Sequence, residues 1–334
     1  MIVLGIETSC DETSAAVVSN GSKVLSNEVA SSIKFHSKYG GIIPEIASRM
    51  QLETISEVVA SALKEARVKL KDIGLISVTS GPGLSGSLLV GISFAKALSL
   101  SLKIPLLGVN HVHSHFYANL LNQRKNNIKF PFISLVASGG HTSLFYIRDF
   151  DRIHTLGQTY DDACGEAFDK VAKILGLGYP GGPEIERFAL KGDPKSIKFN
   201  CSGTKGKFDF SFSGIKTAAL NYLHKNTSKK RKKRDILIKD ICASFQDTVI
   251  DVLIKKSFLA CKLKKSRILL LGGGVVANKR LREKFLNAAG KNSLTCYFPP
   301  LAYSMDNAAM VAGLGYQLFK KGKQSNLYLN MDLS

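Results

Sequence analysis

Residues 2–29, IVLGIETSCDETSAAVVSNGSKVLSNEV, contain three short apolar runs separated by one polar turn and one glycine-containing turn. Each run is rich in β-branched residues and is too short for an average helix, so residues 2–6, 14–18 and 23–29 are expected to be strands. Runs that follow one another this closely usually pair as neighbours in one sheet. The stretch therefore predicts a three-stranded meander.

The same pattern returns at residues 132–147, FISLVASGGHTSLFYI, where strands at 132–136 and 143–147 flank a glycine turn. In both places the strands open a segment in which short buried runs alternate with longer amphipathic stretches, and this alternation is typical of α/β layers. The repeat predicts a duplicated α/β architecture. Further expected elements are helices at 44–66, from about 84, from about 111, at 163–175, 183–190, 235–263 and about 306–319, and strands at 75–79, 106–109 and 267–271.

The length of 334 residues favours two domains, because single hydrophobic cores usually stop growing near about 250 residues. We expect residues 1–110 to form the first domain, completed by the C-terminal helix at about 306–334. Residues 111–305 are expected to form the second domain, with helical insertions. The basic run at 225–234 has no apolar face to bury, so it is expected to be a loop between helices.

The charge of the chain is strongly unbalanced. Its 46 Lys and Arg residues against 26 Asp and Glu residues give a formal net charge of +20. An excess of this size favours a polyanionic partner such as nucleic acid over an acidic protein or a neutral metabolite alone.

The sequence contains no signal for secretion or membrane insertion. The N-terminus lacks a basic segment and carries acidic residues from Glu7 onward. No run reaches the roughly 18 uninterrupted apolar residues of a membrane span. The six cysteines include no C-x-x-C pair, which favours reduced thiols. We therefore expect a soluble, cytoplasmic protein with no membrane contact.

His111 and His115 lie four residues apart at a predicted helix start, so both imidazoles share one face and could bind one metal ion. A third ligand has to come from elsewhere, and Asp306, expected at the start of the last helix, is the best single candidate. The simpler alternatives are structural histidines for the pair and a helix N-cap for Asp306. Val112 stands where a zinc protease carries Glu, so peptide hydrolysis is disfavoured.

Two glycine clusters follow predicted strands. Gly139 and Gly140 lie in a hairpin turn where backbone N–H groups could approach an anion, with an ordinary hairpin as the simpler alternative. The run at 272–277, GGGVVA, matches the dinucleotide pattern, but no acid follows about 20 residues later, so a nicotinamide cofactor is rejected. What remains is a glycine-lined helix start suited to adenosine or phosphate, with Asn278 placed to hydrogen-bond it.

The turn between the first two strands places Asp11 and Glu12 side by side among hydroxyl residues. Surface turns often have this composition. Beside a phosphate site, however, two adjacent carboxylates could bind a cation through water or accept a proton during group transfer.

Together, the glycine turns and the glycine-led helix resemble the actin, sugar kinase and heat-shock ATPase superfamily. The resemblance implies duplicated ribonuclease-H-like domains with a nucleotide site in the cleft between them. Longer motifs are similar to the bacterial tRNA N(6)-adenosine threonylcarbamoyltransferase family (TsaD, of the Kae/Qri type, formerly described as an O-sialoglycoprotein endopeptidase). They run in family order: GIETSCDET at 5–13, YGGIIPE at 39–45, ASR at 47–49, GPGL at 81–84, NH at 110–111 with His115, SGGHT at 138–142, GEAFDK at 165–170, YPGGP at 179–183, FSFSGIK at 210–216 and DNAA at 306–309.

This resemblance implies an acyltransferase. It would move the threonylcarbamoyl group from threonylcarbamoyl-adenylate to the exocyclic amine of the adenosine 3′ of the anticodon, in tRNAs that read codons starting with A, and release AMP. One divalent ion, Fe²⁺ or Zn²⁺, would be held by His111, His115 and Asp306. The implied contacts to the adenylate, or to ATP or AMP in the cleft, are Ala137, Ser138, Gly139, Gly140, His141, Asp169, Gly182, Glu186 and Asn278.

The catalytic residues are a separate hypothesis. Asp11 or Glu12 would accept the proton that the attacking amine loses. The implied partners are tRNA, a smaller non-catalytic paralogue (TsaB-like) and a P-loop ATPase (TsaE-like), with a functional link to the synthase that makes the adenylate. The sequence departs from the family pattern at Gln51, where many relatives carry His, and in the longer basic insert at 225–234.

Three other functions compete with this interpretation. A small-molecule kinase would share the fold but transfer the γ-phosphate without tRNA. A non-catalytic paralogue would lack the triple of His111, His115 and Asp306. A glycopeptidase would need a catalytic Glu where Val112 stands.

Overall fold

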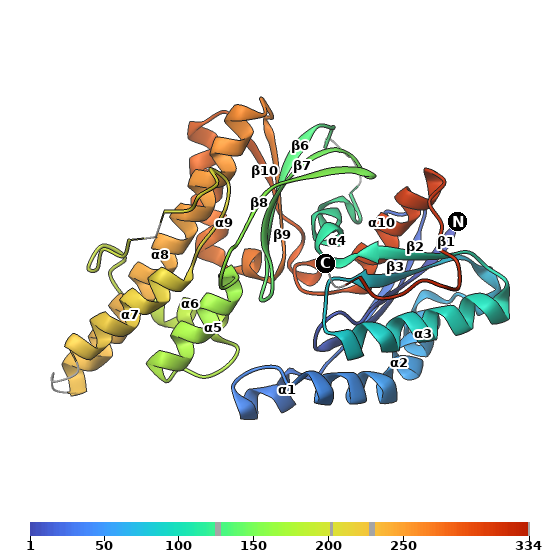
Figure 1. The fold of residues 1–334 in the computed structure, drawn as a ribbon, viewed down its shortest axis with the longest axis horizontal. Coiled ribbons are helices and arrows are strands. Elements are labelled where there is room, and N and C mark those ends of the chain that lie inside the picture. Colours follow the sequence, from blue (N-terminus) through green and yellow to red (C-terminus); the bar gives the residue numbers. More distant parts are fainter. Residues whose placement is uncertain (124–127, 201–202, 227–230, 333–334) are drawn as a thin grey trace. The chain divides into compact units, whose positions relative to one another are not determined.

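The computed structural model describes residues 1–123, 128–200, 203–226 and 231–332 (Figure 1). The chain divides into two compact units, Met1–Ile128 with Pro299–Ser334, and Lys129–Phe298. The expected boundary after residue 110 falls inside the first unit, because α4 (His111–Tyr117) packs against α10 (Ala308–Lys320) of that unit. The histidine pair and Asp306 therefore belong to the same unit.

The first sheet has five strands in the order β3-β2-β1-β4-β5. β1, β2 and β3 pair antiparallel, whereas β4 runs parallel to β1 and β5 parallel to β4. The predicted meander is confirmed. The strands are β1 (Ile2–Glu7), β2 (Glu12–Ser19), β3 (Lys23–Ser31), β4 (Ile73–Gly81) and β5 (Leu106–Asn110).

Helices cover both faces of this sheet, which is why the central strand β1 is almost entirely buried (Figure 1). α2 (Pro44–Ala66) and α3 (Ser85–Leu102) pack against each other and against β2, β3 and β4. Leu4 and Ile6 point into the core on their side, whereas Gly5 faces α10 on the other. Pro44 occupies the first turn of α2, as expected, and the short helix α1 (Ile33–His36) precedes it.

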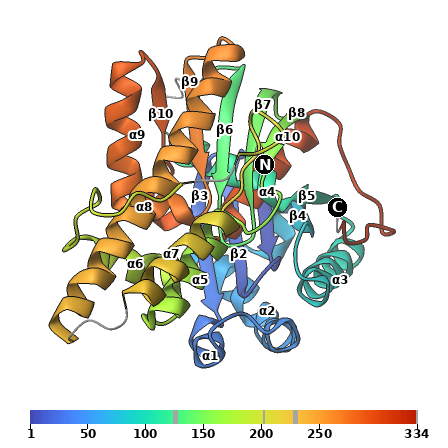
Figure 2. The ribbon, with the colours of Figure 1, turned by 60° about the vertical axis from the view of Figure 1, so that its left-hand side comes forward.

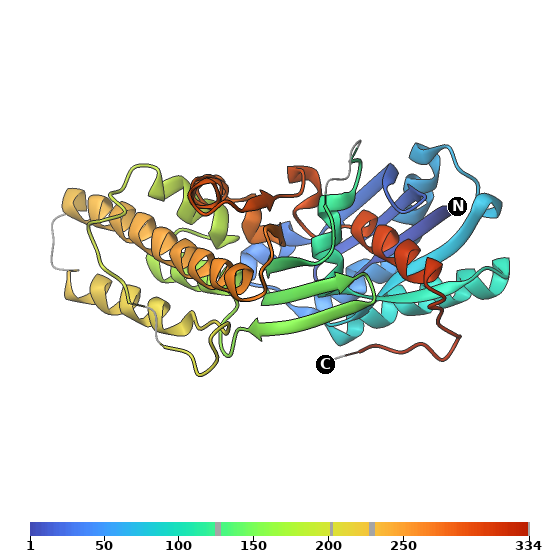
Figure 3. The ribbon, with the colours of Figure 1, turned by 90° about the horizontal axis from the view of Figure 1, so that it is seen from above.

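The second sheet repeats the first. Its order is β10-β9-β6-β7-β8, with β6, β7 and β8 antiparallel, β9 parallel to β6 and β10 parallel to β9. The predicted duplication is confirmed, and each strand of the first sheet has a counterpart here, including β8 and β10, which were not among the expected strands. Figure 3 shows the β7–β8 hairpin most clearly. The strands are β6 (Phe132–Ala137), β7 (Thr142–Asp149), β8 (Arg152–Gln158), β9 (Ile268–Gly272) and β10 (Thr295–Tyr297).

Five helices are described in the second unit, and α8 lies alongside α6 and α7 (Figure 2). α7 was not expected from the sequence, although Ile215, Ala219 and Leu223 recur every four residues on its buried face. That spacing is a helical signal. The helices are α5 (Cys164–Leu175), α6 (Gly181–Ala189), α7 (Ser213–Lys225), α8 (Arg231–Leu263) and α9 (Lys279–Lys291).

The basic run at 225–234 differs from the expected loop. Residues 231–234 form the start of α8, and 227–230 lie outside the described residues. Arg and Lys are good helix formers, so a charged segment can continue a long helix without an apolar face of its own. The expectation of a loop over 231–234 was wrong.

α3 is long and apolar enough to cross a membrane, judged by length and composition alone, although Lys96 lies within it. Core helices of soluble proteins meet the same test. Here α3 buries Leu88, Ile92 and Ala95 in the core of the first unit and packs on β4.

After α10 the chain runs as an extended tail back to the first sheet (Figure 3). The Ser325 N–H donates to the Leu106 carbonyl at 2.9 Å, and the Asp332 N–H donates to the Ser80 carbonyl at 2.7 Å. The tail thus occupies part of the otherwise open edge at β5.

The contact between β1 and α10 requires glycine at position 5. A Cβ on Gly5 would lie 2.3 Å from the carbonyl oxygen of Ala308 and 2.9 Å from Cβ of Ala312. We expect Gly5→Ala to push α10 away from the sheet and to lower the free energy of unfolding of the first unit by about 1–3 kcal/mol. Urea titration with hydrogen exchange at amides of that unit measures the loss.

Gly41→Ala is the matched control, because a Cβ there would meet no atom of the described residues within 4 Å. If Gly5→Ala and Gly41→Ala unfold at the same urea concentration, the close approach of α10 to β1 is refuted.

Candidate functional site

The histidine pair is positioned by the end of β5. Asn110, the last residue of that strand, caps α4, with its Oδ1 accepting a hydrogen bond from the His113 N–H at 2.9 Å. The helix therefore starts at His111. His111 and His115 lie one turn apart and are both buried, with ring centroids 4.7 Å apart.

Asp306 completes the predicted cluster. Its Oδ1 lies 3.4 Å from Nε2 of His115 and 3.8 Å from Nε2 of His111. Asp306 is not the helix cap that was the simpler alternative: α10 begins at Ala308, and Asn307 is the cap, accepting a hydrogen bond from the Met310 N–H at 3.1 Å. Its carboxylate is therefore not needed for capping and faces the two imidazoles.

The cluster fits a divalent metal ion. One donor atom from each of the three residues lies within 4.8 Å of the others. Ligands bound at about 2.0–2.2 Å around a tetrahedral ion lie about 3.4 Å apart, close to the distances from Asp306 to both histidines. Two imidazoles and one carboxylate suit zinc or ferrous iron.

Electrostatics around the cluster favour positive charge. Burial lowers the pKa of His111, but the carboxylates of Glu7 and Asp306 outweigh this effect and raise it to about 9. Burial raises the pKa of Asp306 to about 6, where His111 opposes the shift and Glu7 and Asp11 add to it. Several carboxylates gathered in a buried place are costly unless a cation or proton compensates them.

The acidic turn between β1 and β2 lies beside this cluster. Burial raises the pKa of Glu12 well above its usual range, and the negative charges of Asp306 and Asp11 add to the effect. Oδ2 of Asp11 is buried and has no hydrogen-bond partner among the described residues. The structure therefore brings both predicted catalytic carboxylates close enough to Asp306 to interact with it electrostatically.

Gln51 holds the acidic turn in place. Its Nε2 donates to the carbonyl oxygens of Cys10 and Glu12, at 2.9 Å in both cases. Gln51 lies on α2 and is 1% exposed. The sequence marked this position only as a departure from the family pattern, because its partners lie about 40 residues away along the chain.

In the second unit, the turn between β6 and β7 is closed by the Ser138 N–H, which donates to the His141 carbonyl at 2.8 Å. α5 begins directly against this turn. The Gly165 N–H donates to the Ser138 carbonyl at 3.0 Å, and a Cβ on Gly165 would lie 2.7 Å from that oxygen. Gly139 and Gly140 are exposed, so their backbone is accessible.

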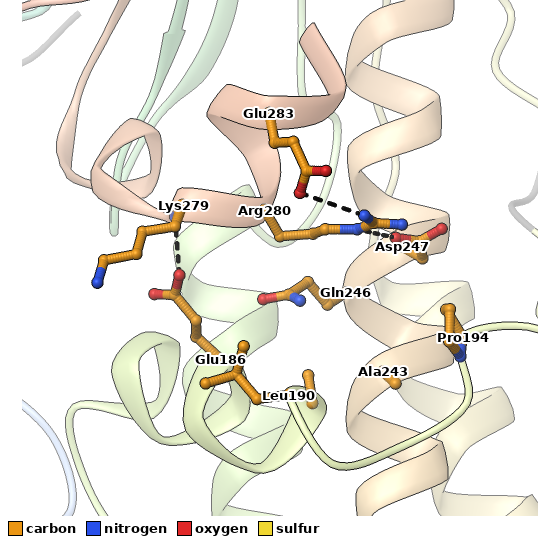
Figure 4. Close-up of a pocket in the computed structure, with 10 residues that line it drawn as sticks. Glu186, Leu190, Pro194, Ala243, Gln246, Asp247, Lys279, Arg280 and Glu283 are labelled. Carbon is orange, nitrogen blue, oxygen red and sulfur yellow. Dashed lines mark hydrogen bonds and ion pairs between the residues drawn. The ribbon is translucent and has the colours of Figure 1, made fainter. Parts of the chain in front are cut away.

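Two acids that the sequence alone did not single out connect α5 to α6 and α6 to α9. Asp169, one turn after Gly165 on α5, accepts a hydrogen bond from the Gly181 N–H at 2.6 Å, where α6 begins. Glu186 on α6 accepts one from the Lys279 N–H at 2.7 Å, at the start of α9 (Figure 4). Gly182 is half-buried beside the first of these contacts.

The glycine run after β9 reaches the same turn. Gly273 has a φ of 91°, and a Cβ there would lie 2.4 Å from the Ala137 carbonyl oxygen, so only glycine fits. The run opens a short 3₁₀ turn at Gly274–Ala277, where the start of a helix was expected, and α9 begins at Lys279.

Asn278 is the N-cap of α9. Its Oδ1 accepts a hydrogen bond from the Leu281 N–H at 2.9 Å, and its Nδ2 donates to Oε1 of Gln246 at 2.7 Å. Within the described part of the chain, these two hydrogen bonds leave one amide hydrogen and one lone pair of the side chain for another partner.

A cavity of about 310 Å³ opens beside Glu186 and the start of α9 (Figure 4). Arg280 donates to Asp247 at 3.0 Å, and both residues line this cavity. The sequence pattern did not predict that these charged residues line a cavity, because acids and bases on amphipathic helices ordinarily indicate a solvated face. The lining residues are Glu186, Ala189, Leu190, Pro194, Ala243, Gln246, Asp247, Lys279, Arg280 and Glu283.

Two sheets of identical strand order define the class of protein. The chain has the duplicated ribonuclease-H-like fold found in actin, sugar kinases and heat-shock ATPases. It is similar to HypF of T. kodakarensis (TM-score 0.65, 14% identity, 96% of this chain and 48% of that one). It is also similar to a ROK hexokinase of Thermus thermophilus (TM-score 0.50, 14% identity, 96% of this chain and 100% of that one). At these identities the likeness concerns the fold alone.

Sequence comparison narrows the class to one family. The sequence model of "TsaD: tRNA N6-adenosine threonylcarbamoyltransferase" matches residues 23–313. The tRNA N6-adenosine threonylcarbamoyltransferase of Thermosipho melanesiensis is 52% identical over 328 residues, 98% of each chain. That of Clostridium kluyveri is 49% identical over 331 residues, 98% of this chain and 95% of the relative. The chain belongs to this family.

Gln51 offers a test of how the acidic turn is held. Gln51→Leu keeps a side chain of similar length but removes the donor to two carbonyl groups. We expect a loss of about 1–3 kcal/mol in the free energy of unfolding of the first unit, because the carbonyls of Cys10 and Glu12 lose this partner in a buried place. Urea unfolding followed by hydrogen exchange measures it.

Gln158→Leu, at an exposed position on β8, serves as the control for replacing Gln by Leu. Equal free energies of unfolding for the two variants would show that the hydrogen bonds from Gln51 to the acidic turn do not stabilise the first unit.

Proposed function

We propose that this protein transfers a threonylcarbamoyl group from threonylcarbamoyl-adenylate to the exocyclic amine of the adenosine 3′ of the anticodon, in tRNAs that read codons starting with A, and releases AMP. The observation that carries the proposal is the meeting of His111, His115 and Asp306 in a chain that belongs to the threonylcarbamoyltransferase family along nearly its whole length.

The reaction requires little activation of the donor. The donor is a mixed carbamic–phosphoric anhydride, so the amine nitrogen attacks the carbamoyl carbon, the bond from that carbon to the phosphate oxygen breaks, and AMP leaves. The protein has to orient the two substrates and stabilise the charge that develops. A bound divalent ion, Fe²⁺ or Zn²⁺, would supply Lewis acidity toward an oxygen of the donor.

His111, His115 and Asp306 are the residues that would hold this ion. They would leave coordination positions open for substrate oxygen, as catalytic sites with three protein ligands do. The burial of His111 and His115 limits the access of bulk water to those positions.

The adenylate would bind in the second unit. The exposed backbone of Gly139 and Gly140 suits its phosphate, with Ala137, Ser138 and His141 completing the turn. The residues that follow this turn suit the nucleoside, because they combine carboxylates with an amide that can donate and accept hydrogen bonds. They are Asp169, Gly182, Glu186 and Asn278.

Asp11 and Glu12 are the carboxylates that we propose as acceptors of the proton that the attacking amine loses. The charge of +20 suits the phosphates of a tRNA. The family resemblance adds a smaller TsaB-like paralogue and a TsaE-like P-loop ATPase as partners, a functional link to the adenylate synthase, and a cytoplasmic location.

Reconstitution tests the activity and the metal together. Purified protein, the two partner proteins, tRNA and threonylcarbamoyl-adenylate labelled in its threonine part are mixed, and label in tRNA is counted. We expect His111→Ala to lose at least about 100-fold in transfer, since a ligand that stabilises the transition state is removed, and to lose the bound metal, measured by mass spectrometry of the protein.

His154→Ala, which alters an exposed histidine of β8, is the control and should keep both. Label transfer that is unaffected by His111→Ala would refute the role of the cluster. Transfer of the γ-phosphate of ATP to a small acceptor without tRNA would favour a kinase instead.

Glu12 can be tested separately from substrate binding. In the same assay Glu12→Gln should slow the single-turnover transfer step by about 10²–10⁴-fold while adenylate affinity stays within about twofold, because a general base acts in the chemical step. Asp11→Asn distinguishes the two neighbours. If Glu12→Gln transfers at the full rate with intact adenylate binding, Glu12 is not the base.

A further inference from the structure

Glu7 is a buried carboxylate for which the sequence motifs provide no role. It is the last residue of β1, the central strand of the first sheet, and is 1% exposed. A carboxylate in such a place is costly unless other groups satisfy it. The hydrogen-bond partners of this carboxylate therefore indicate its role.

Both oxygens of Glu7 are engaged at short distances. Oε1 accepts a hydrogen bond from the Ser9 N–H at 2.5 Å, and Oε2 accepts one from the Thr79 hydroxyl at 2.6 Å. Oε2 also lies 3.0 Å from Nδ1 of His111, and the Ser9 hydroxyl lies 3.0 Å from the same nitrogen. The carboxylate is fixed by a backbone group and by the neighbouring strand, and it is directed at one ring nitrogen.

The chemistry of these contacts assigns the proton. An ionised carboxylate can only accept hydrogen bonds, so Nδ1 of His111 has to be the donor. An imidazole that binds a metal is neutral, and with its proton on Nδ1 its lone pair lies on Nε2. Nε2 is the atom that faces Asp306, at 3.8 Å.

We propose that Glu7 is a positioning residue that holds His111 with Nδ1 protonated and Nε2 available as a metal ligand. The inference rests on the metal role of the cluster in the proposed function. A purely structural buried acid would stabilise the fold without affecting metal affinity. A carboxylate behind a ligating histidine instead orients the ring and makes it a better ligand.

The test is metal affinity, measured without any turnover. Metal-free full-length protein is titrated with Zn²⁺ against a chromophoric chelator. We expect Glu7→Gln to bind Zn²⁺ about 10–100-fold more weakly than wild type, as changes behind metal ligands commonly do. Glu57→Gln, at an exposed position of α2, is the matched control and should bind as wild type does.

Ring-nitrogen NMR of the Zn²⁺-loaded protein supplies a second readout. In wild type, His111 should carry its proton on Nδ1 and its metal on Nε2, whereas Glu7→Gln should show a second ring form or exchange broadening. If Glu7→Gln does not fold, Thr79→Val removes only the hydroxyl donor to Oε2 and should weaken Zn²⁺ binding in the same direction by a smaller factor.

The outcomes separate the two claims. Wild-type Zn²⁺ affinity in Glu7→Gln, or in Thr79→Val where that variant replaces it, overturns the role of Glu7 and leaves the metal site standing. Equal Zn²⁺ binding by wild type and His111→Ala instead refutes the metal site of the proposed function, and the role of Glu7 fails with it.

Discussion

The carboxylate of Glu7 lies at the end of a buried central strand, 3.0 Å from the ring of a histidine that follows a strand two places away in the same sheet. That contact is possible because β1, β4 and β5 run parallel and end at one edge. Glu7, Thr79 and His111 are supplied by these three ends in turn. Parallel strands gather side chains that are distant in sequence, and the helix that carries His111 and His115 starts where they gather.

A second constraint is the return of the chain through α10. This helix packs on the face of the sheet opposite α2 and α3, against Gly5, and Asn307 takes over the capping of its first turn. Asp306 is therefore placed beside the histidines and remains chemically available. The packing of α10 against Gly5 thus also determines where Asp306 lies relative to His111 and His115.

Much of the fold could be predicted from short-range patterns, because the meander, its repeat and the spacing of His111 and His115 are local signals. The edge strand β8 was missed, since its exposed residues obscure the strand pattern. Gln51 and Glu7 were missed because their partners lie far away in sequence and only the folded chain brings them together. Asp169 and Glu186 entered the expected adenylate site through the family resemblance alone, because acids on amphipathic helices give no signal of their own.

The first unit is built from residues 1–128 and 299–334, with the second unit inserted between them. On the ribosome, the second unit can therefore fold as soon as it emerges, whereas the first stays unfinished until residues 306–320 have been translated. Until then Gly5 lacks its helix and the two imidazoles lack their carboxylate. The cluster of His111, His115 and Asp306 is in this way completed late, and a nascent chain truncated before residue 306 lacks one of its three members.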